Sequence, residues 1–276
     1  MTHFKKAVIA AGGAGTRFLP ITKSVPKEML PLASKPVVQY AVEEIAVSGI
    51  KDITFVIAHG KESIVDYFSQ DPGLETLLVA RGDASSLRKI RALSRMAHFS
   101  RVYQPAPLGL GHAVGLTAEI VGEEPFALVL PDDVIDAKEP VLKQMLEVYK
   151  KHPGNILLVE KCRPEDTARY GIIDAETVSP GVYRVKNLVE KPKPQDAPSN
   201  LAIVGRYLLM PQIFEAIARS KPGKGGEIQL TDAIRLLLEN QPVYACEFEG
   251  TRYDTGTPDG WLAANNAWAE KERARS

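Results

Sequence analysis

A glycine-rich turn with two cations behind it is the part of the sequence that most clearly points to chemistry. The string GGAGTR at residues 12–17 follows a short apolar run, and PKEMLP follows at residues 26–31. Glycine lets the backbone approach a ligand closely, so that its N–H groups can line a phosphate site. Arg17 and Lys27 can then neutralise a polyphosphate that the turn has gathered. The pattern therefore favours a nucleotide-binding turn over an ordinary strand-to-helix turn with surface cations.

Two better-known glycine loops do not fit the sequence. The first turn lacks the third glycine of a dinucleotide fingerprint, which argues against a nicotinamide dehydrogenase. Gly60-Lys61 and Gly223-Lys224 lack both the earlier glycine and the following Ser or Thr of a P-loop. The phosphate site that we expect is therefore of another kind.

Gln104 is a candidate for reading a base. It follows the predicted strand 99–103 and precedes a glycine turn that contains Gly109. A glutamine amide offers both a donor and an acceptor, which matches the edge of a pyrimidine, and a bare glycine admits the ring. The alternative is a polar loop residue with no ligand to bind.

Two neighbouring carboxylates suit a metal ion. Asp132 and Asp133 follow the best strand pattern of the chain, at 126–130. Mg²⁺ commonly takes one or two carboxylates together with phosphate oxygens, whereas an acidic turn or a helix cap is the alternative. Asp254 lies on a second glycine turn near the end of the sequence, and it can share one metal with Asp132 if the fold brings them together.

A carboxylate and an ammonium group stand side by side at the end of another predicted strand. Glu190 and Lys191 are followed by Pro192, which restricts the chain just beyond them, so that the two side chains can be aimed. A carboxylate suits sugar hydroxyls, and a lysine binds a phosphate as a point charge. A solvated strand end is the alternative. The five histidines show no metal spacing, and neither a Ser–His–Asp nor a Cys–His arrangement can be argued.

The hydrophobic pattern of the first 150 residues supplies a scaffold for these candidates. We expect strands at 7–10, 53–57, 99–103 and 126–130, and helices at 37–47, 62–68, 74–96 and 111–120. Strands and helices that alternate at this spacing form parallel strands with right-handed crossovers. Ligands bind beyond the carboxyl ends of such strands, where the glycine turn, Gln104 and Asp132 fall.

After about residue 151 the pattern changes to strands separated by turns. We expect strands at 156–160, 182–190, 201–209 and 243–248, and helices at 212–218, 230–239 and from Pro258. The predicted fold class is α/β, with a mixed, mostly parallel central sheet flanked by helices. The second half elaborates the first, which predicts one domain over residues 1–276.

The bulk properties exclude several classes of protein. The chain has 276 residues, 45% of them hydrophobic and 25% charged, and its formal net charge is zero. A protein that binds nucleic acid or an acidic membrane nonspecifically carries excess positive charge, so neither partner is expected. The two cysteines, Cys162 and Cys246, do not support a disulfide framework. No apolar run is long enough for a signal-peptide core or a membrane span, and we expect a cytoplasmic protein.

Several strings together resemble the sugar-1-phosphate nucleotidyltransferases. GGAGTR and PKEMLP look like the signature of that family. Four further strings resemble the uridylyl-transferring branch of the family: LGLGHA at 108–113, EKPKP at 190–194, APSNLAIVGRY at 197–207 and EIQLTDAI at 227–234. The resemblance runs from about residue 6 to residue 261. One string departs from it: DTGTPD at 254–259 looks more like the thymidylyl-transferring relatives, because the uridylyl branch often has a cysteine after the aspartate.

The resemblance implies a Rossmann-like nucleotidyltransferase fold and a role for each matching position. By this resemblance, the catalytic residues are Arg17, Lys27, Lys191 and Asp132, and the ligands of Mg²⁺ are Asp132 and Asp254. Ala11, Gly12 and Gly13 would contact the nucleoside. Glu28 would bind a ribose hydroxyl, and Gln104 and Gly109 would contact the base. The hexose falls on Gly171, Glu190 and Val204.

The implied activity is the Mg²⁺-dependent transfer of a uridylyl group from UTP to glucose 1-phosphate, which yields UDP-glucose and pyrophosphate. The first half, to about residue 150, would bind the nucleotide, and residues 151–276 would bind the sugar phosphate. The resemblance also implies a homodimer or a homotetramer. Thymidylyl transfer from dTTP and a non-catalytic sensor of sugar nucleotides are the alternatives.

Overall fold

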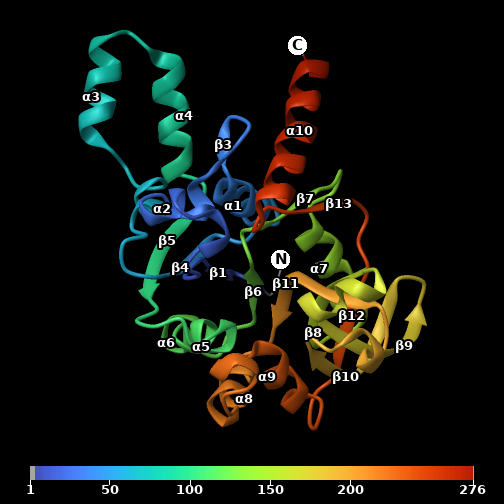
Figure 1. Ribbon diagram of the computed structural model, residues 1–276. Coiled ribbons are helices and arrows are strands. Elements are labelled where there is room, and N and C mark those ends of the chain that lie inside the picture. The colour runs from blue at the N-terminus through green and yellow to red at the C-terminus, as the bar shows by residue number, and fades with distance from the viewer. Residues whose placement is uncertain (1–3, 276) are drawn as a thin grey trace.

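The computed structural model describes residues 4–275, and within them one nine-stranded sheet runs through the molecule (Figure 1). In spatial order its strands are β5 (His98–Tyr103), β4 (Asp52–Ile57), β1 (Lys6–Ala10), β6 (Phe126–Val129), β11 (Leu201–Leu209), β8 (Asn155–Lys161), β12 (Val243–Cys246), β10 (Val182–Glu190) and β9 (Gly171–Ser179). β10 and β11 run against the other strands, so the sheet is mixed with most strands in one direction, as predicted.

Helices cover both faces of this sheet. The helices are α1 (Val37–Val47), α2 (Ser63–Asp66), α3 (Pro72–Ala80), α4 (Ala84–Ser94), α5 (Leu110–Gly115), α6 (Ala118–Val121), α7 (Val141–Lys151), α8 (Ile213–Arg219), α9 (Leu230–Leu237) and α10 (Pro258–Arg275). In Figure 1, α1 and α7 lie on one side of the sheet and α5, α8 and α9 on the other. Two short ribbons complete the fold: β7 (Asp133–Asp136) pairs with β13 (Thr251–Asp254), and β2 (Pro31–Leu32) pairs with β3 (Lys35–Pro36).

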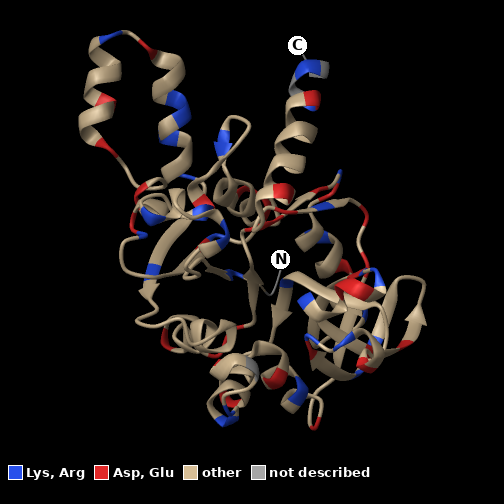
Figure 2. Cartoon of the chain, in the orientation of Figure 1, with Lys and Arg blue, Asp and Glu red and all other residues tan. Residues whose placement is uncertain are grey.

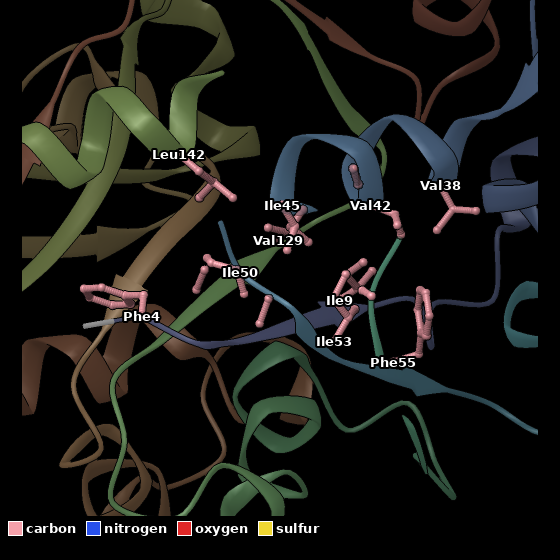
Figure 3. Packing of buried hydrophobic residues seen from close by; sticks show 14 of the residues in the cluster. Phe4, Ile9, Val38, Val42, Ile45, Ile50, Ile53, Phe55, Val129 and Leu142 are labelled. Carbon is pink, nitrogen blue, oxygen red and sulfur yellow. The ribbon is translucent and has the colours of Figure 1, made fainter. Parts of the chain in front are cut away.

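The alternation of side chains along β1 explains why its apolar run is continuous. Ile9 packs into the core beneath α1, and Val8 belongs to the core on the opposite face with α5 and α8. Figure 3 shows Val38, Val42 and Ile45 of α1 pointing toward the strands from above. Because a central parallel strand is buried on both faces, both sets of positions are apolar. The glycine turn therefore begins on a rigid strand.

Most of the predicted elements are confirmed, and the differences have local reasons. The helical stretch predicted at 74–96 is a hairpin of α3 and α4 that projects from the body (Figure 1). It divides at Asp83, whose side chain caps α4 by accepting from the Ser86 N–H. The helix predicted at 111–120 is likewise two short helices, α5 and α6. The elements α7, β7, β9 and β13 and the short strands β2 and β3 were not predicted from the sequence.

Charged residues of both signs are interspersed over the helices and loops seen in Figure 2. An anion site in this molecule therefore depends on a local cluster of cations. Among the residues that the structure describes, no helix combines the length and the apolar character needed to cross a membrane.

Candidate active site

The carboxyl ends of four parallel strands place the predicted nucleotide residues at one edge of the sheet. β1 lies between β4 and β6, with Ala10 opposite Val56 and Ile9 opposite Val129. β5 extends this edge next to β4. The segments that follow these strands are the glycine turn, the loop at 58–61, the Gln104 segment and the loop that carries Asp132. The predicted convergence of strand ends is thus found.

The glycine turn is shaped by two close approaches. Gly15 has φ of 66°, a left-handed conformation that suits glycine, and its carbonyl accepts a hydrogen bond of 2.8 Å from Thr22 Oγ1. A Cβ on Gly12 would collide with Oε1 of Gln104. A Cβ on Gly13 would meet nothing within 4 Å, so this residue borders open space. Gly12 therefore permits the close approach of Gln104, while Gly13 leaves room for a ligand.

Gln104 is held by the segment that it precedes. Its side chain is buried, and its Nε2 donates to the Gly109 carbonyl at 3.1 Å and lies 3.1 Å from His112 Nδ1. Gly109 has φ of 99°, and a Cβ there would lie 2.7 Å from the Ile228 carbonyl oxygen. The structure thus gives Gly109 a packing reason for being glycine. Its contact with the base stays a prediction.

A cavity of about 400 Å³ opens beside the glycine turn. It is lined by Gly12 and Ala14, by residues 22–24 and Pro26, by the loop at 58–61 and by residues 104–107. Parts of three strand ends therefore surround one space of the size of a nucleoside pocket, and we call this space the nucleotide cavity.

Glu28 and Lys61 form a buried ion pair beneath the nucleotide cavity. The Glu28 side chain is 1% exposed, and Lys61 Nζ lies 3.1 and 2.9 Å from its two oxygens. Lys61 Nζ also donates to the carbonyl of Ala11 at 2.8 Å. Burial raises the pKa of Glu28, and the Lys61 ammonium acts against that rise. Lys61 was considered in the sequence only as part of a P-loop, although its place just after a strand at this edge was a usable signal.

Asp132 is paired with Lys27, which comes from the second half of the glycine signature. Lys27 belongs to the 3-10 helix η3 (Lys27–Met29), and its Nζ lies 2.5 Å from Asp132 Oδ2. Burial alone would raise the pKa of Asp132, but the ammonium outweighs it and holds that pKa below its usual value. Asp132 is therefore ionised and acceptor-only, as a metal ligand must be.

The β7–β13 ribbon brings Asp254 to Asp132, although they are far apart in the sequence. A Cβ on Gly256 would lie 2.7 Å from Asp132 Oδ2 and 3.1 Å from Asp254 Oδ1. The two oxygens are thus no farther apart than the sum of these distances, and both border the same glycine. The Thr255 backbone N–H and hydroxyl each donate to the Asp132 carbonyl at 2.8 Å, which fixes the two turns together.

These two carboxylates fit a hard divalent cation. Their oxygens converge on one glycine that offers no side chain to fill the space, and phosphate oxygens would supply further ligands. Within residues 4–275 no group of three or more His, Cys, Asp or Glu residues is arranged to hold a metal. A metal here would therefore depend on the substrate for part of its coordination.

Asp133 points away from this pair. Its Oδ1 accepts from Arg252 Nε at 2.6 Å, and its Oδ2 accepts from the Gly205 backbone N–H at 2.8 Å. Arg252 also bonds Glu160 and lies over the ring of Tyr170. Asp133 thus ties β7, β11 and β13 together, and its role is to position its neighbours.

A second cavity, of about 520 Å³, lies between Asp132 and the end of β10, and we call it the sugar-phosphate cavity. Among the residues that line it are seven of those predicted from the sequence: Arg17, Asp132, Gly171, Glu190, Lys191, Val204 and Asp254. Residues from both halves of the chain therefore face one space. Arg17 also lies 3.5 Å from the Gly256 carbonyl oxygen through its Nη1.

The far wall of the sugar-phosphate cavity is built on the β9–β10 pair. Glu190 is opposite Gly171 in this pair, and its Oε2 accepts from Thr231 Oγ1 at 2.7 Å. Lys191, which follows, has φ of 46°, an uncommon conformation for a residue with a Cβ. Its Nζ lies 3.0 Å from Glu190 Oε1. Non-glycine residues in this region of φ and ψ are often found at functional sites.

One further cation lines the sugar-phosphate cavity, Arg169, and it was not predicted from the sequence. It ends the 3-10 helix η4 (Pro164–Arg169), and its Nη2 lies 2.9 Å from Asp254 Oδ2. Its position two residues before the predicted sugar-binding residue Gly171 was a usable signal. A larger and more open hollow, of about 1250 Å³, lies near α7 and the β9–β10 turn, and none of the predicted site residues lines it.

Nearly the whole chain is similar to known nucleotidyltransferases. Residues 6–271 match the nucleotidyl transferase family. The UTP–glucose-1-phosphate uridylyltransferase of Bacillus subtilis strain 168 is 45% identical over 273 residues, which are 99% of this chain and 94% of that protein.

Two solved structures are similar throughout. A structure of UDP-glucose pyrophosphorylase complexed with UDP-glucose has a TM-score of 0.89 and 42% identity, and the match covers 97% of this chain and 99% of that one. UTP-bound UGPase from Acinetobacter baumannii has a TM-score of 0.89 and 36% identity, and the match covers 96% of this chain and 93% of that one. The fold and the family that the sequence motifs indicated are thus confirmed, and the chain belongs to the nucleotidyl transferase family.

Proposed function

We propose that this chain catalyses the reaction of UTP with glucose 1-phosphate to give UDP-glucose and pyrophosphate. The observation that carries the proposal is that Arg17, Asp132 and Lys191, from three distant segments, line one cavity. The relative named UTP–glucose-1-phosphate uridylyltransferase and the similar structures that hold UTP or UDP-glucose support this choice of substrates.

The nucleotide cavity is proposed to hold uridine. Gln104 would read the base, and Gly12 and Gly13 would let the nucleoside lie against the turn. Ala11 and Glu28 would lie beneath the ribose, in positions fixed by Lys61. The phosphates would then extend from the turn toward Asp132, where Arg17 and Lys27 carry positive charge.

The sugar-phosphate cavity is proposed to hold glucose 1-phosphate. Glu190 has one oxygen on Thr231, and its carboxylate can accept from sugar hydroxyls together with the backbone at Gly171 and Val204. Lys191 would bind the phosphate as a point charge. The left-handed backbone of Lys191 and the following Pro192 fix the direction from which its ammonium reaches the cavity.

Asp132 and Asp254 would hold Mg²⁺, the divalent ion that we propose. When bound, this ion would supply positive charge between phosphate oxygens of the nucleotide. Both carboxylates are placed by the β7–β13 ribbon and by Thr255, so that no large movement of the chain is needed to bring them together.

The reaction requires positioning and charge neutralisation. A phosphate oxygen of glucose 1-phosphate would attack the α-phosphorus of UTP in line, and pyrophosphate would leave on the opposite side. The attacking phosphate is already ionised at neutral pH, so no general base is needed. Lys191 would hold the attacking group, and Arg17 and Lys27 would stabilise the leaving group as its charge grows.

The direct test is the release of pyrophosphate from UTP in the presence of Mg²⁺, with and without glucose 1-phosphate. We expect release to depend on the sugar phosphate and UDP-glucose to form in equal amount. Competition with dTTP tests the base and ribose contacts, and UTP should be used in preference. Binding of UDP-glucose without any turnover would instead indicate a sensor, and preference for dTTP would indicate a thymidylyltransferase.

The remaining expectations are also proposals. Strands of both halves join in one sheet, which supports a single domain over residues 1–276 with the nucleotide half to about residue 150. We propose a cytoplasmic enzyme that works as a homodimer or homotetramer. Light scattering of the purified protein in solution tests the oligomeric state.

A further inference from the structure

Each of the two proposed metal ligands is paired with a cation of the chain. Asp132 is paired with Lys27 at 2.5 Å, and Asp254 is paired with Arg169 at 2.9 Å. Together the two cations carry the same charge as one divalent ion. A divalent metal ion that binds both carboxylates can therefore replace the two cations without changing the net charge beside the carboxylates.

Arg169 is placed so that it can leave Asp254 for a phosphate. Its side chain is 47% exposed and lies over the ring of Tyr170, with 5.5 Å between the guanidinium carbon and the ring centroid. It lines the sugar-phosphate cavity together with Lys191. A long side chain at a cavity wall can change its direction at small cost, whereas the buried Arg252 behind it is held by two carboxylates.

The backbone places Arg169 and Lys191 next to the same part of the cavity. The Lys191 N–H donates to the carbonyl of Tyr170 at 2.9 Å, and Tyr170 directly follows Arg169. In the next register position Gly171 is opposite Glu190. The two cations thus extend from neighbouring segments at the end of the β9–β10 pair, where the phosphate of the sugar is proposed to bind.

We infer that Arg169 is a phosphate-binding residue that exchanges partners, from Asp254 in the metal-free protein to the phosphate of glucose 1-phosphate when a divalent ion takes Asp254. Lys27 makes the matching exchange, from Asp132 to the phosphates of the nucleotide. The inference rests on the proposed function, because that function supplies the two phosphorylated ligands.

The exchange has a consequence for metal binding. A divalent ion alone must displace both cations. Lys27 then loses its ion pair with Asp132, and Arg169 exchanges its contact of 2.9 Å with Asp254 for the longer one of 3.5 Å that it has with Asp166. The ion therefore binds weakly to the substrate-free protein. With the phosphorylated ligands present, the displaced cations gain new partners. Metal and sugar phosphate should therefore strengthen each other's binding, a coupling that is reciprocal.

The first experiment titrates Mn²⁺, as a substitute for Mg²⁺, into the substrate-free protein and follows free Mn²⁺ by electron paramagnetic resonance. Arg169→Met should bind Mn²⁺ about threefold to tenfold more tightly than wild type, because one competing cation is gone. Arg235→Met is the matched control. Arg235 also pairs with an aspartate, Asp232, but it is 55% exposed and does not line the cavity. Its Mn²⁺ affinity should equal that of wild type.

The second experiment measures the KM values of the same variants. Arg169→Met should raise the KM for glucose 1-phosphate about tenfold while changing the KM for UTP much less, and Arg169→Lys should lie between the two. A residue that merely held Asp254 in place would weaken Mn²⁺ binding when removed, which would overturn the inference. Tighter Mn²⁺ binding with an unchanged KM for glucose 1-phosphate would overturn it as well.

The proposed function can fail separately from this inference. Wild-type protein that releases no pyrophosphate from UTP and glucose 1-phosphate would overturn the function. In that case, tighter Mn²⁺ binding by Arg169→Met would still support the exchange at Asp254.

Discussion

The two sides of the site use their ionised residues differently. On the nucleotide side, Glu28 and Lys61 are buried together, and Lys61 also holds the carbonyl of Ala11. On the sugar-phosphate side, Lys191 and Arg169 are partly exposed and face a cavity. The first pair fixes the backbone that a nucleotide would rest on, whereas the second pair of residues lines a cavity in which a phosphate can bind.

The difference teaches which measurement reports on which residue. Removing one partner of a buried pair leaves an uncompensated charge in the interior, so the loss falls on folding. Removing a partly exposed cation at a cavity wall leaves the fold unchanged, so the loss falls on ligands and turnover. Substitutions on the two sides should therefore separate stability from catalysis.

The largest effect is expected from Lys61→Met. The substitution leaves Glu28 buried without its partner, which should lower the free energy of unfolding by about 3–5 kcal/mol. Urea denaturation followed by circular dichroism measures it. Lys150→Met removes the exposed pair with Glu147 and should cost less than about 1 kcal/mol. Equal losses in the two variants would show that the buried pair has no special role.

Lys191→Ala should have the opposite effect, a loss of turnover with unchanged stability. Loss of the cation that holds the attacking phosphate should lower kcat by about 10²–10³-fold, roughly 3–4 kcal/mol in the barrier, and leave the unfolding curve unchanged. Lys193→Ala removes an exposed lysine two residues later and should leave kcat unchanged. Steady-state pyrophosphate release measures both variants. Near-normal turnover in Lys191→Ala would refute the role of that lysine.

Two glycines test whether the comparison extends to the backbone. A Cβ on Gly205 would lie 2.6 Å from Asp133 Oδ2 and 2.8 Å from Leu130 Cβ, so Gly205→Ala should cost about 1–3 kcal/mol of stability. Gly13→Ala meets no atom within 4 Å and should keep its stability within about 0.5 kcal/mol while raising the KM for UTP. Thermal unfolding and kinetics of the two variants measure these effects, and the reverse ranking in stability would contradict the described packing.

The smallest effect concerns pH. The pKa of Glu28 is raised by burial in the folded chain, so this carboxyl group stabilises the fold below its usual pKa, and that contribution is lost as the pH rises through the raised value. The free energy of unfolding of wild type should therefore fall relative to that of Glu28→Gln as the pH rises above about 4.5, the usual pKa of a glutamate. Urea denaturation at several pH values tests this, and a constant or growing advantage of wild type would contradict it.

The nucleotide side was largely predictable because its residues follow consecutive strands. Alternating strands and helices imply parallel strands, and their carboxyl ends must meet at one edge. The glycine turn, Gln104 and Asp132 could therefore be placed together without further information. Lys61 was at the same edge, but it was judged only against the spacing of a P-loop.

The sugar-phosphate side was harder because it depends on antiparallel pairing between distant segments. The approach of Asp254 to Asp132 follows from the β7–β13 ribbon, whose strands have four residues each. Short strands carry little hydrophobic periodicity, and their partner and register cannot be derived from spacing. β9 was not predicted because most residues of its second half are exposed at the sheet edge, so that half has no alternation of buried and exposed side chains. The signal for α7 was present in the spacing of Val141, Leu142, Met145 and Leu146, and it was not used.

The antiparallel strand β11 has a consequence for how substrates enter and products leave. It lies between β6 of the first half and β8 of the second, and it is hydrogen-bonded to both. Swinging the halves apart would break the row of backbone hydrogen bonds between β6 and the buried strand β11, each bond worth about 1 kcal/mol. The molecule therefore cannot open like a jaw around its ligands. Admission and release depend instead on local segments at the rim, such as the turn at 12–17 and the loop at 58–61.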